Sequence, residues 1–203
     1  GGFEDYIVND LVKYMDSHYS TMANKDGRAV IGFSQGGYAA VKFGMTHSDI
    51  FGVVAGHTGM LFLDGVLSLG PMISAENPDG NIVPDPNKFF TSAVFAMSSA
   101  WSPNINNPPF MVDLPFDWNS GAIIPSVKEK WMEHDVFTML DKYHENLRSL
   151  NGVFIDCGTL DEFGFSPMVD VFCQFFTHFS PKPDKYRFPG LCLLNEQILF
   201  FRS

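Results

Sequence analysis

The stretch "GFSQGG", residues 32 to 37, places a serine among glycines between an apolar run and an alanine-rich run. The run before it, "RAVIGF", predicts a short buried strand, and "GGYAAVKFGM" after it predicts a helix whose alanines permit close packing. A strand that passes into a helix through so few residues needs a tight turn, and a tight turn leaves little space for side chains. The stretch therefore constrains this part of the chain to a strand, a sharp turn at Ser34 and a helix.

Length and composition predict a globular protein with a single core. The chain has 203 residues, of which 45% are hydrophobic and 18% charged, which is typical of a folded chain and not of a disordered one. The formal net charge of −10 argues against nucleic acid and anionic membrane surfaces as partners, because both attract clustered Lys and Arg. No apolar run approaches the roughly 18 residues of a membrane-spanning helix. We therefore expect one domain over residues 1–203, without a nucleic-acid or membrane partner.

Strands and helices alternate along most of the chain. The spacing of apolar residues predicts helices over residues 3–19, 134–150 and 166–179, and a short terminal helix in "NEQILFFRS". Further short strands are predicted in "SDIFGVVAG", "VFIDCG" and "KYRF". This alternation predicts an α/β fold with a mostly parallel sheet and helices on both faces.

Residues 60–131, which follow the second predicted strand, interrupt this alternation. Two segments, "ENPDGNIVPDPN" and "SPNINNPPFMVDLPFD", are rich in Pro, Asn and Asp and predict loops, whereas "KFFTSAVFAMSSAW" between them predicts a helix. We interpret this part as a lid-like insertion that covers one end of the sheet; the alternative is a surface excursion without a role. Its larger aromatic residues are candidates for pocket walls or for core packing: Trp101, Phe110, Trp118 and Trp131.

Ser34 is a candidate nucleophile. A serine hydroxyl is a poor nucleophile until a base removes its proton, and it must project from the backbone toward a substrate. A tight strand-to-helix turn achieves this projection, and the small residues Gly32, Gly36 and Gly37 suit such a turn. The backbone N–H of Gln35 can then donate to a developing oxyanion. A structural glycine turn that contains a serine is the alternative, but the flanking strand and helix favour the nucleophile.

A second candidate group follows the predicted strand "VFIDC". The turn "GTLDEFG" carries Asp161 and Glu162, and acids at the carboxyl end of a parallel strand lie at the same sheet edge as the serine turn. An acid that caps its own turn is the alternative, and it is common. Position alone leaves both roles open for Asp161.

Three segments together resemble a known family. "EDYIVNDLVKYMD", "RAVIGFSQGGYAAVKFGMTHSDIFGVVAGHTG" and "VFIDCGTLDEFG" are similar to the Putative esterase family of α/β-hydrolases, which includes S-formylglutathione hydrolases, feruloyl esterases and mycolyltransferases. The resemblance implies an α/β-hydrolase fold and hydrolysis of small-molecule carboxylic esters through an acyl-enzyme, with acyl transfer as a related reaction. It implies a Ser–Asp–His triad with Ser34 as nucleophile and Asp161, in preference to Glu162, as acid. It also implies that Gln35 supplies one oxyanion amide.

The chain departs from the family pattern before the serine. The family places several strands and an oxyanion-hole loop ahead of the nucleophile turn, whereas only 33 residues precede Ser34 here. We therefore expect a partial α/β-hydrolase that lacks the early strands and the second oxyanion donor. An exposed sheet edge would follow from this, and it suggests a homo-oligomer formed through that edge.

The position of the catalytic base is the second departure. The family's histidine follows "PG" after the last core strand, but here "YRFPG" is followed by Leu191 and Cys192. His178 is the histidine that keeps the chain order Ser, Asp, His, although a residue at this position is ordinarily a solvated helix end. His57 closes the strand after the serine turn and is either a base or a pocket-rim residue. A third alternative is that no base is present, which gives a weak or inactive esterase or a non-catalytic hydrolase-like binding protein.

No cofactor or metal is expected from the sequence. The spacing of Cys157, Cys173 and Cys192 matches no zinc or redox motif, and buried free thiols are the expectation for all three. The sequence also lacks a phosphate-binding loop and a dinucleotide fingerprint.

Overall fold

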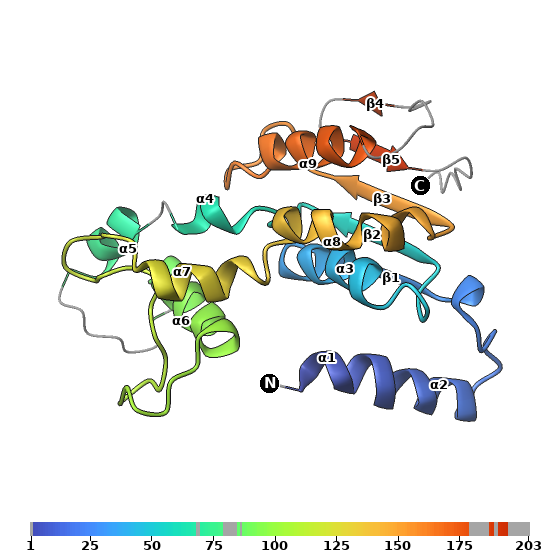
Figure 1. Cartoon of the computed structure of the whole chain (residues 1–203), viewed down its shortest axis with the longest axis horizontal. Helices are drawn as coiled ribbons and strands as arrows, with labels where there is room; N and C mark the ends of the chain where they lie inside the picture. Colours follow the sequence, from blue (N-terminus) through green and yellow to red (C-terminus); the bar gives the residue numbers. More distant parts are fainter. Residues whose placement is uncertain are drawn as a thin grey trace. The chain divides into compact units, whose positions relative to one another are not determined.

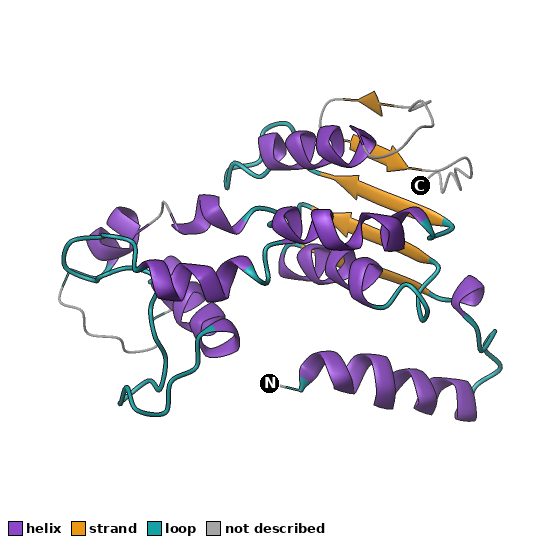
Figure 2. Ribbon diagram, in the orientation of Figure 1, coloured by secondary structure: helices purple, strands orange, loops and turns teal. Residues whose placement is uncertain are grey.

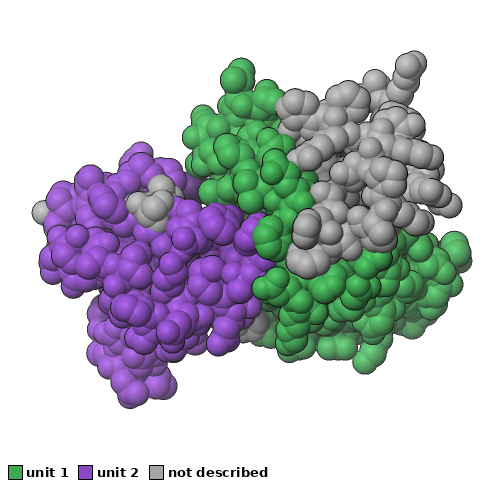
Figure 3. Space-filling model, turned by 45° about the horizontal axis from the view of Figure 1, so that its top comes forward, with its two compact units in different colours: residues 1–61, 139–203 green, residues 62–138 purple. Residues whose placement is uncertain are grey.

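The computed structural model describes residues 2–67, 70–78, 85, 87–178, 187–188 and 191–194, without the side chains of 177–178 and of the last two segments. The predicted terminal helix in residues 195–203 lies outside the described residues. The chain divides into two compact units, coloured separately in Figure 3. The first unit combines residues 1–61 with 139–203, and the second is residues 62–138.

A five-stranded sheet with the order β1-β2-β3-β5-β4 forms the first unit (Figures 1 and 2). Its strands are β1 (Ala29–Phe33), β2 (Val53–His57), β3 (Gly152–Asp156), β4 (Arg187–Phe188) and β5 (Leu191–Leu194). The first three are parallel, whereas β5 runs antiparallel to both β3 and β4. The predicted α/β fold with a mostly parallel sheet is confirmed. Strand β5 was not predicted from the sequence.

Strand β2 begins later than the apolar run "SDIFGVVAG" predicts. The backbone N–H groups of Ile50 and Phe51 donate to the carbonyl oxygen of His47 at 3.0 and 3.1 Å. These bonds close a turn, so its residues are not available for sheet pairing. The strand therefore starts only at Val53.

The helices of the first unit are α1 (Phe3–Asp5), α2 (Val12–His18), α3 (Gln35–Thr46), α9 (Ser166–His178) and the part of α8 (Val136–Arg148) that follows Thr138. A π-helical stretch, Tyr6–Leu11, joins α1 to α2, so the predicted first helix is present over 3–18. It is tied to α3 by the Glu4 carboxylate, which accepts from Lys42 Nζ at 3.1 Å and pairs with His47 Nε2 at 2.7 Å.

The second unit contains more helix than its composition predicts. Its helices are α4 (Leu63–Leu67), α5 (Gly70–Glu76), α6 (Phe89–Trp101) and α7 (Pro125–Met132), of which only α6 was predicted. The fully buried carboxylate of Asp135 accepts from the backbone N–H of Leu63 at 2.6 Å and of Thr138 at 2.7 Å. One side chain thus joins the first and last segments of the unit.

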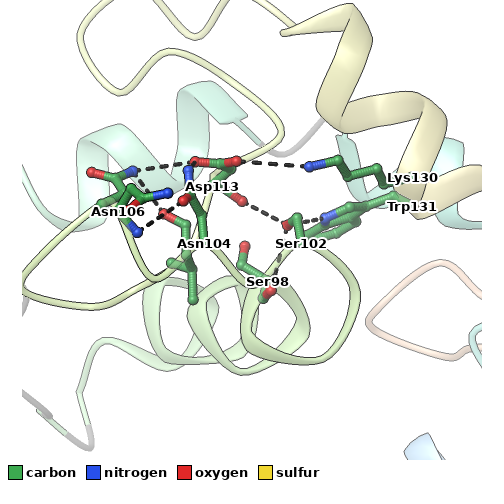
Figure 4. A network of polar contacts seen from close by, with 9 residues as sticks. Ser98, Ser102, Asn104, Asn106, Asp113, Lys130 and Trp131 are labelled. Atoms are coloured by element: carbon green, nitrogen blue, oxygen red, sulfur yellow. Dashed lines mark hydrogen bonds and ion pairs between the residues drawn. The ribbon is translucent and has the colours of Figure 1, made fainter.

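Trp131, a candidate pocket wall, is a core residue of the second unit. Its ring is fully buried, and its indole N–H donates to Ser102 Oγ at 3.0 Å (Figure 4). Ser102 Oγ in turn donates to the carbonyl oxygen of Asp113 at 2.6 Å, and the Trp101 ring packs edge-on at 5.1 Å between centroids. The aromatic residues that this structure groups around Trp131 therefore stabilise the unit itself.

Candidate functional site

Ser34 lies on the predicted junction between β1 and α3. Its backbone has φ 55° and ψ −117°, a conformation that residues with a side chain rarely adopt. Two backbone hydrogen bonds hold it there: its N–H donates to the carbonyl oxygen of His57 at 2.9 Å, and its own carbonyl accepts from Tyr38 at 3.1 Å. The side chain is exposed and makes no capping hydrogen bond to α3. The turn thus presents a free hydroxyl on a strained backbone, as nucleophile turns do.

Two of the three glycines around Ser34 are required by close packing. A Cβ atom on Gly32 would overlap the backbone of Gly36, and one on Gly37 would lie 2.6 Å from the carbonyl oxygen of His57. A Cβ on Gly36 would meet nothing within 4 Å. The expectation that the turn excludes a side chain at Gly36 is therefore wrong. The close contact at this position is made by the backbone of Gly36, which approaches Gly32.

The amino end of α3 supplies donors next to Ser34. The bond from Tyr38 N–H to Ser34 is the first of the helix, so the N–H groups of Gln35, Gly36 and Gly37 have no acceptor within it. These groups and the helix dipole favour negative charge at this end of α3. The N–H of Gln35, the predicted oxyanion donor, belongs to the residue directly after the serine.

Asp161 lies in the turn that follows β3. Its Oδ2 accepts from the backbone N–H of Phe165 at 2.7 Å, and its own N–H donates to Gly158 at 3.0 Å. The carboxylate therefore holds the turn just before α9, which is the capping role that the sequence left open. Glu162 beside it is exposed.

A second carboxylate is aligned with the end of β1 by the sheet register. Phe33 pairs with His57, and His57 pairs with Asp156, so the ends of three neighbouring strands meet here. His57 Nδ1 lies 2.8 Å from Asp156 Oδ1, and both side chains are about one-third exposed, at 37% and 33%. Asp156 was not among the predicted site residues. One feature of the sequence could have indicated it. Asp156 ends the apolar run "VFID", and the strand before it in the chain also ends in a titratable residue, His57.

The remaining histidines are distributed over the molecule. His178 is the last residue of α9, and its side chain lies outside the described part of the chain. His18 is exposed on α2, and His47 is paired with Glu4. His134 stacks on Trp101 in the second unit, and His144 contacts the carbonyl oxygen of Leu140. Among the described histidine side chains, His57 is the one at the end of the strand next to Ser34.

Cys157, which directly follows Asp156, is poorly suited to act as a second nucleophile. Burial raises the pKa of its thiol, and the negative charge of Asp161 raises it further. The thiol therefore stays protonated near neutral pH, and only thiolates are strong nucleophiles.

The described residues lack the side-chain cluster of a metal site and the long apolar helix of a membrane span. Within them, no three His, Cys, Asp or Glu side chains gather closely enough to hold a metal ion. None of the described helices is both long and apolar enough to cross a bilayer.

Comparison with known proteins shows that the sequence is similar to esterases. The sequence model of a family described as "Putative esterase" matches residues 2–178. Two similar curated proteins are Esterase Rv1288 and Esterase MT1326, from the H37Rv and CDC 1551 strains of Mycobacterium tuberculosis. Each is 33% identical over 57 residues, which are 28% of this chain and 12% of the relative. The matched segment thus spans about an eighth of the length of these curated relatives.

Proposed function

This chain belongs to the Putative esterase family, and from that premise we propose that it hydrolyses carboxylic esters through an acyl-enzyme on Ser34. The observation that carries the proposal is the serine turn itself. It combines a strained backbone, an exposed hydroxyl without a capping bond and the free N–H groups at the start of α3. A purely structural turn needs neither the strained backbone nor an exposed hydroxyl, because strain costs stability.

The proposed reaction proceeds in two steps. Ser34 Oγ attacks the ester carbonyl carbon as its proton passes to a base, and the carbonyl π electrons move onto the oxygen. The N–H of Gln35 stabilises that oxyanion, which re-forms the carbonyl and expels the alcohol with the proton held by the base. Water then attacks the acyl-serine, gives a proton to the same base and releases the acid, while Ser34 Oγ recovers its proton.

The family pattern assigns the remaining roles within this proposal. Asp161 is the predicted acid that orients the base, and His178 and His57 are the two candidates for that base. The substrate class is a small-molecule ester. Homo-oligomerisation through the β1 edge belongs to the same proposal, because β1 ends the sheet order of the described strands.

Hydrolysis of a short-chain p-nitrophenyl ester tests the function, with Ser34→Ala as the matched control. We expect turnover in the wild-type protein and its loss in the variant, together with Ser34-dependent labelling by a fluorophosphonate probe. Both proteins must show the same cooperative melting transition. A folded wild-type protein with neither turnover above the control nor labelling overturns the proposal and favours a non-catalytic binding protein.

A further inference from the structure

The ends of the three parallel strands place Ser34, His57 and Asp156 at neighbouring positions of one sheet edge. The register aligns Phe33 with His57 and His57 with Asp156, and Ser34 follows Phe33 directly. Parallel strands lie only about 5 Å apart, so neighbouring positions at one sheet edge are within side-chain reach. Two backbone bonds lock this alignment beyond the strands: Ser34 N–H donates to His57, and Thr58 N–H donates to Asp156 at 2.7 Å.

The contact between His57 and Asp156 selects one tautomer of the imidazole. An ionised carboxylate only accepts hydrogen bonds, so the nitrogen 2.8 Å from it, Nδ1, carries the proton. Nε2 is then left with a lone pair, and it has no hydrogen-bond partner among the described residues. The Phe154 ring, 5.4 Å away between centroids, packs against the imidazole and limits its rotation. A general base for a serine needs this arrangement, with one nitrogen held and the other free.

Two residues beside these strand ends have a strained backbone conformation. Ser34 has φ 55° and Thr58, the residue after His57, has φ 48°. A positive φ is costly for both residue types, and such strain persists where the surrounding structure holds it, commonly at active sites. The strained positions flank the strand ends that carry the hydroxyl and the imidazole.

We propose that His57, oriented through Nδ1 by Asp156, is the general base that activates Ser34. The inference rests on the proposed esterase function and names its base. His57 Nε2 takes the Ser34 proton during attack, gives it to the leaving alcohol, and then takes a proton from water in deacylation. Asp156 accepts the hydrogen bond of Nδ1 and holds the imidazole, so it is a positioning residue. In this arrangement Asp161 remains the cap of its own turn, bonded to Phe165.

Ester hydrolysis by matched histidine variants tests the assignment. We expect His57→Ala to lose about 10²- to 10⁴-fold in kcat with KM nearly unchanged, because the lost group acts on a proton and not on binding. Millimolar imidazole should restore part of that activity, since the cavity left by the ring can admit it. His18→Ala, at an exposed histidine of α2, should keep the wild-type rate.

Variants of Asp156 separate orientation from structure. Asp156→Asn removes the charge and can present a donor to Nδ1, so it should lower kcat by about 10-fold or more without changing KM or the melting temperature. Asp156→Glu, which keeps the carboxylate, should recover part of the loss.

The outcomes distinguish this inference from the proposed function. If Ser34→Ala abolishes turnover but His57→Ala retains it, the esterase stands and the His57 assignment is overturned. Loss of activity in His178→Ala together with retention in His57→Ala overturns it as well. A loss in His57→Ala that imidazole does not relieve, accompanied by a lower melting temperature, also counts against it. If wild type and Ser34→Ala are equally inactive, the proposed function fails first.

Discussion

Gly36 and Gly37 are sequence neighbours that meet opposite surroundings. A Cβ atom on Gly37 would lie 2.6 Å from the His57 carbonyl oxygen, which is itself the acceptor for Ser34. The corresponding atom on Gly36 would enter open space. Two adjacent alanine substitutions therefore test how tightly the serine turn is packed.

We expect Gly37→Ala to destabilise the protein by about 1–3 kcal/mol, because the methyl group would push α3 away from β2. Gly36→Ala should be neutral or stabilising by up to about 1 kcal/mol, since alanine has less backbone freedom to lose in a helix. Urea unfolding of both variants measures the difference. Equal stabilities would show that the turn relaxes around either methyl group.

The first helical segment is attached to α3 by a pH-sensitive contact at Glu4. Burial raises the pKa of this carboxyl, but its bonds with His47 and Lys42 outweigh burial, and the net pKa lies below the ordinary 4.5. A lowered pKa in the folded state means that the unfolded chain binds more protons in this range. The stability from this group is therefore fully present above pH 4.5 and is lost as the pH falls through the folded pKa.

Glu4→Gln should accordingly lower the unfolding free energy at pH 7 and have no effect in strong acid. The side chain is 36% exposed, so solvent screening limits the expected loss to about 1 kcal/mol or less. Urea unfolding at pH 7 and pH 3 measures the two differences. Glu129→Gln, at an exposed position, is the control and should be neutral at both pH values. A Glu4→Gln penalty as large at pH 3 as at pH 7 would assign the contact to packing instead of charge.

Two buried serines at the carboxyl end of helix α6 differ in their hydrogen bonding: Ser98 lies in the helix and Ser102 directly follows it. Ser98 Oγ is buried and has no hydrogen-bond partner among the described residues, whereas Ser102 Oγ connects Trp131 to Asp113 (Figure 4). Ser98→Ala should therefore be neutral or stabilise by about 1 kcal/mol, because it removes an unpaired hydroxyl. Ser102→Ala should destabilise by about 1–3 kcal/mol, since it leaves a buried indole N–H without an acceptor. Thermal unfolding of the pair measures both; equal losses would mean that Ser98 has a partner in solution.

The sheet as a whole has an exposed apolar edge. Ile31 and Phe33 on β1 are 66% and 70% exposed, and β1 is the outermost strand on its side of the described sheet. Open strand edges with apolar side chains favour pairing with another chain. We therefore expect the protein to associate with itself as its concentration rises.

Ile31→Thr should weaken that association, because threonine keeps the β-propensity of the strand and removes most of the apolar surface. Leu160→Thr is the matched control: Leu160 is 95% exposed, but it lies in the turn after β3 and not on the edge. Sedimentation velocity over a range of concentrations measures both. A wild-type protein that stays monomeric throughout would show that the edge is not adhesive.

Local chain chemistry was sufficient to predict the serine turn and the order of elements in the first unit. The helix, strand, turn and helix up to residue 46 follow from apolar spacing and from small residues at a tight junction, which act over a few neighbours. The same reasoning predicted mostly loop in residues 60–131, where short helices instead form around buried side chains such as Leu63, Ile73 and Val127. These contacts join positions that no local pattern relates.

The His57–Asp156 pair depends on the sheet register and not on any motif. Its two residues are separated by 99 positions in the chain, and the pairing of three parallel strands alone aligns them with the serine turn. Backbone sterics and side-chain periodicity are short-range, so they determined the serine turn from the sequence alone. Hydrogen bonding between distant strands is long-range, so only the tertiary structure decided which carboxylate and which imidazole stand beside it.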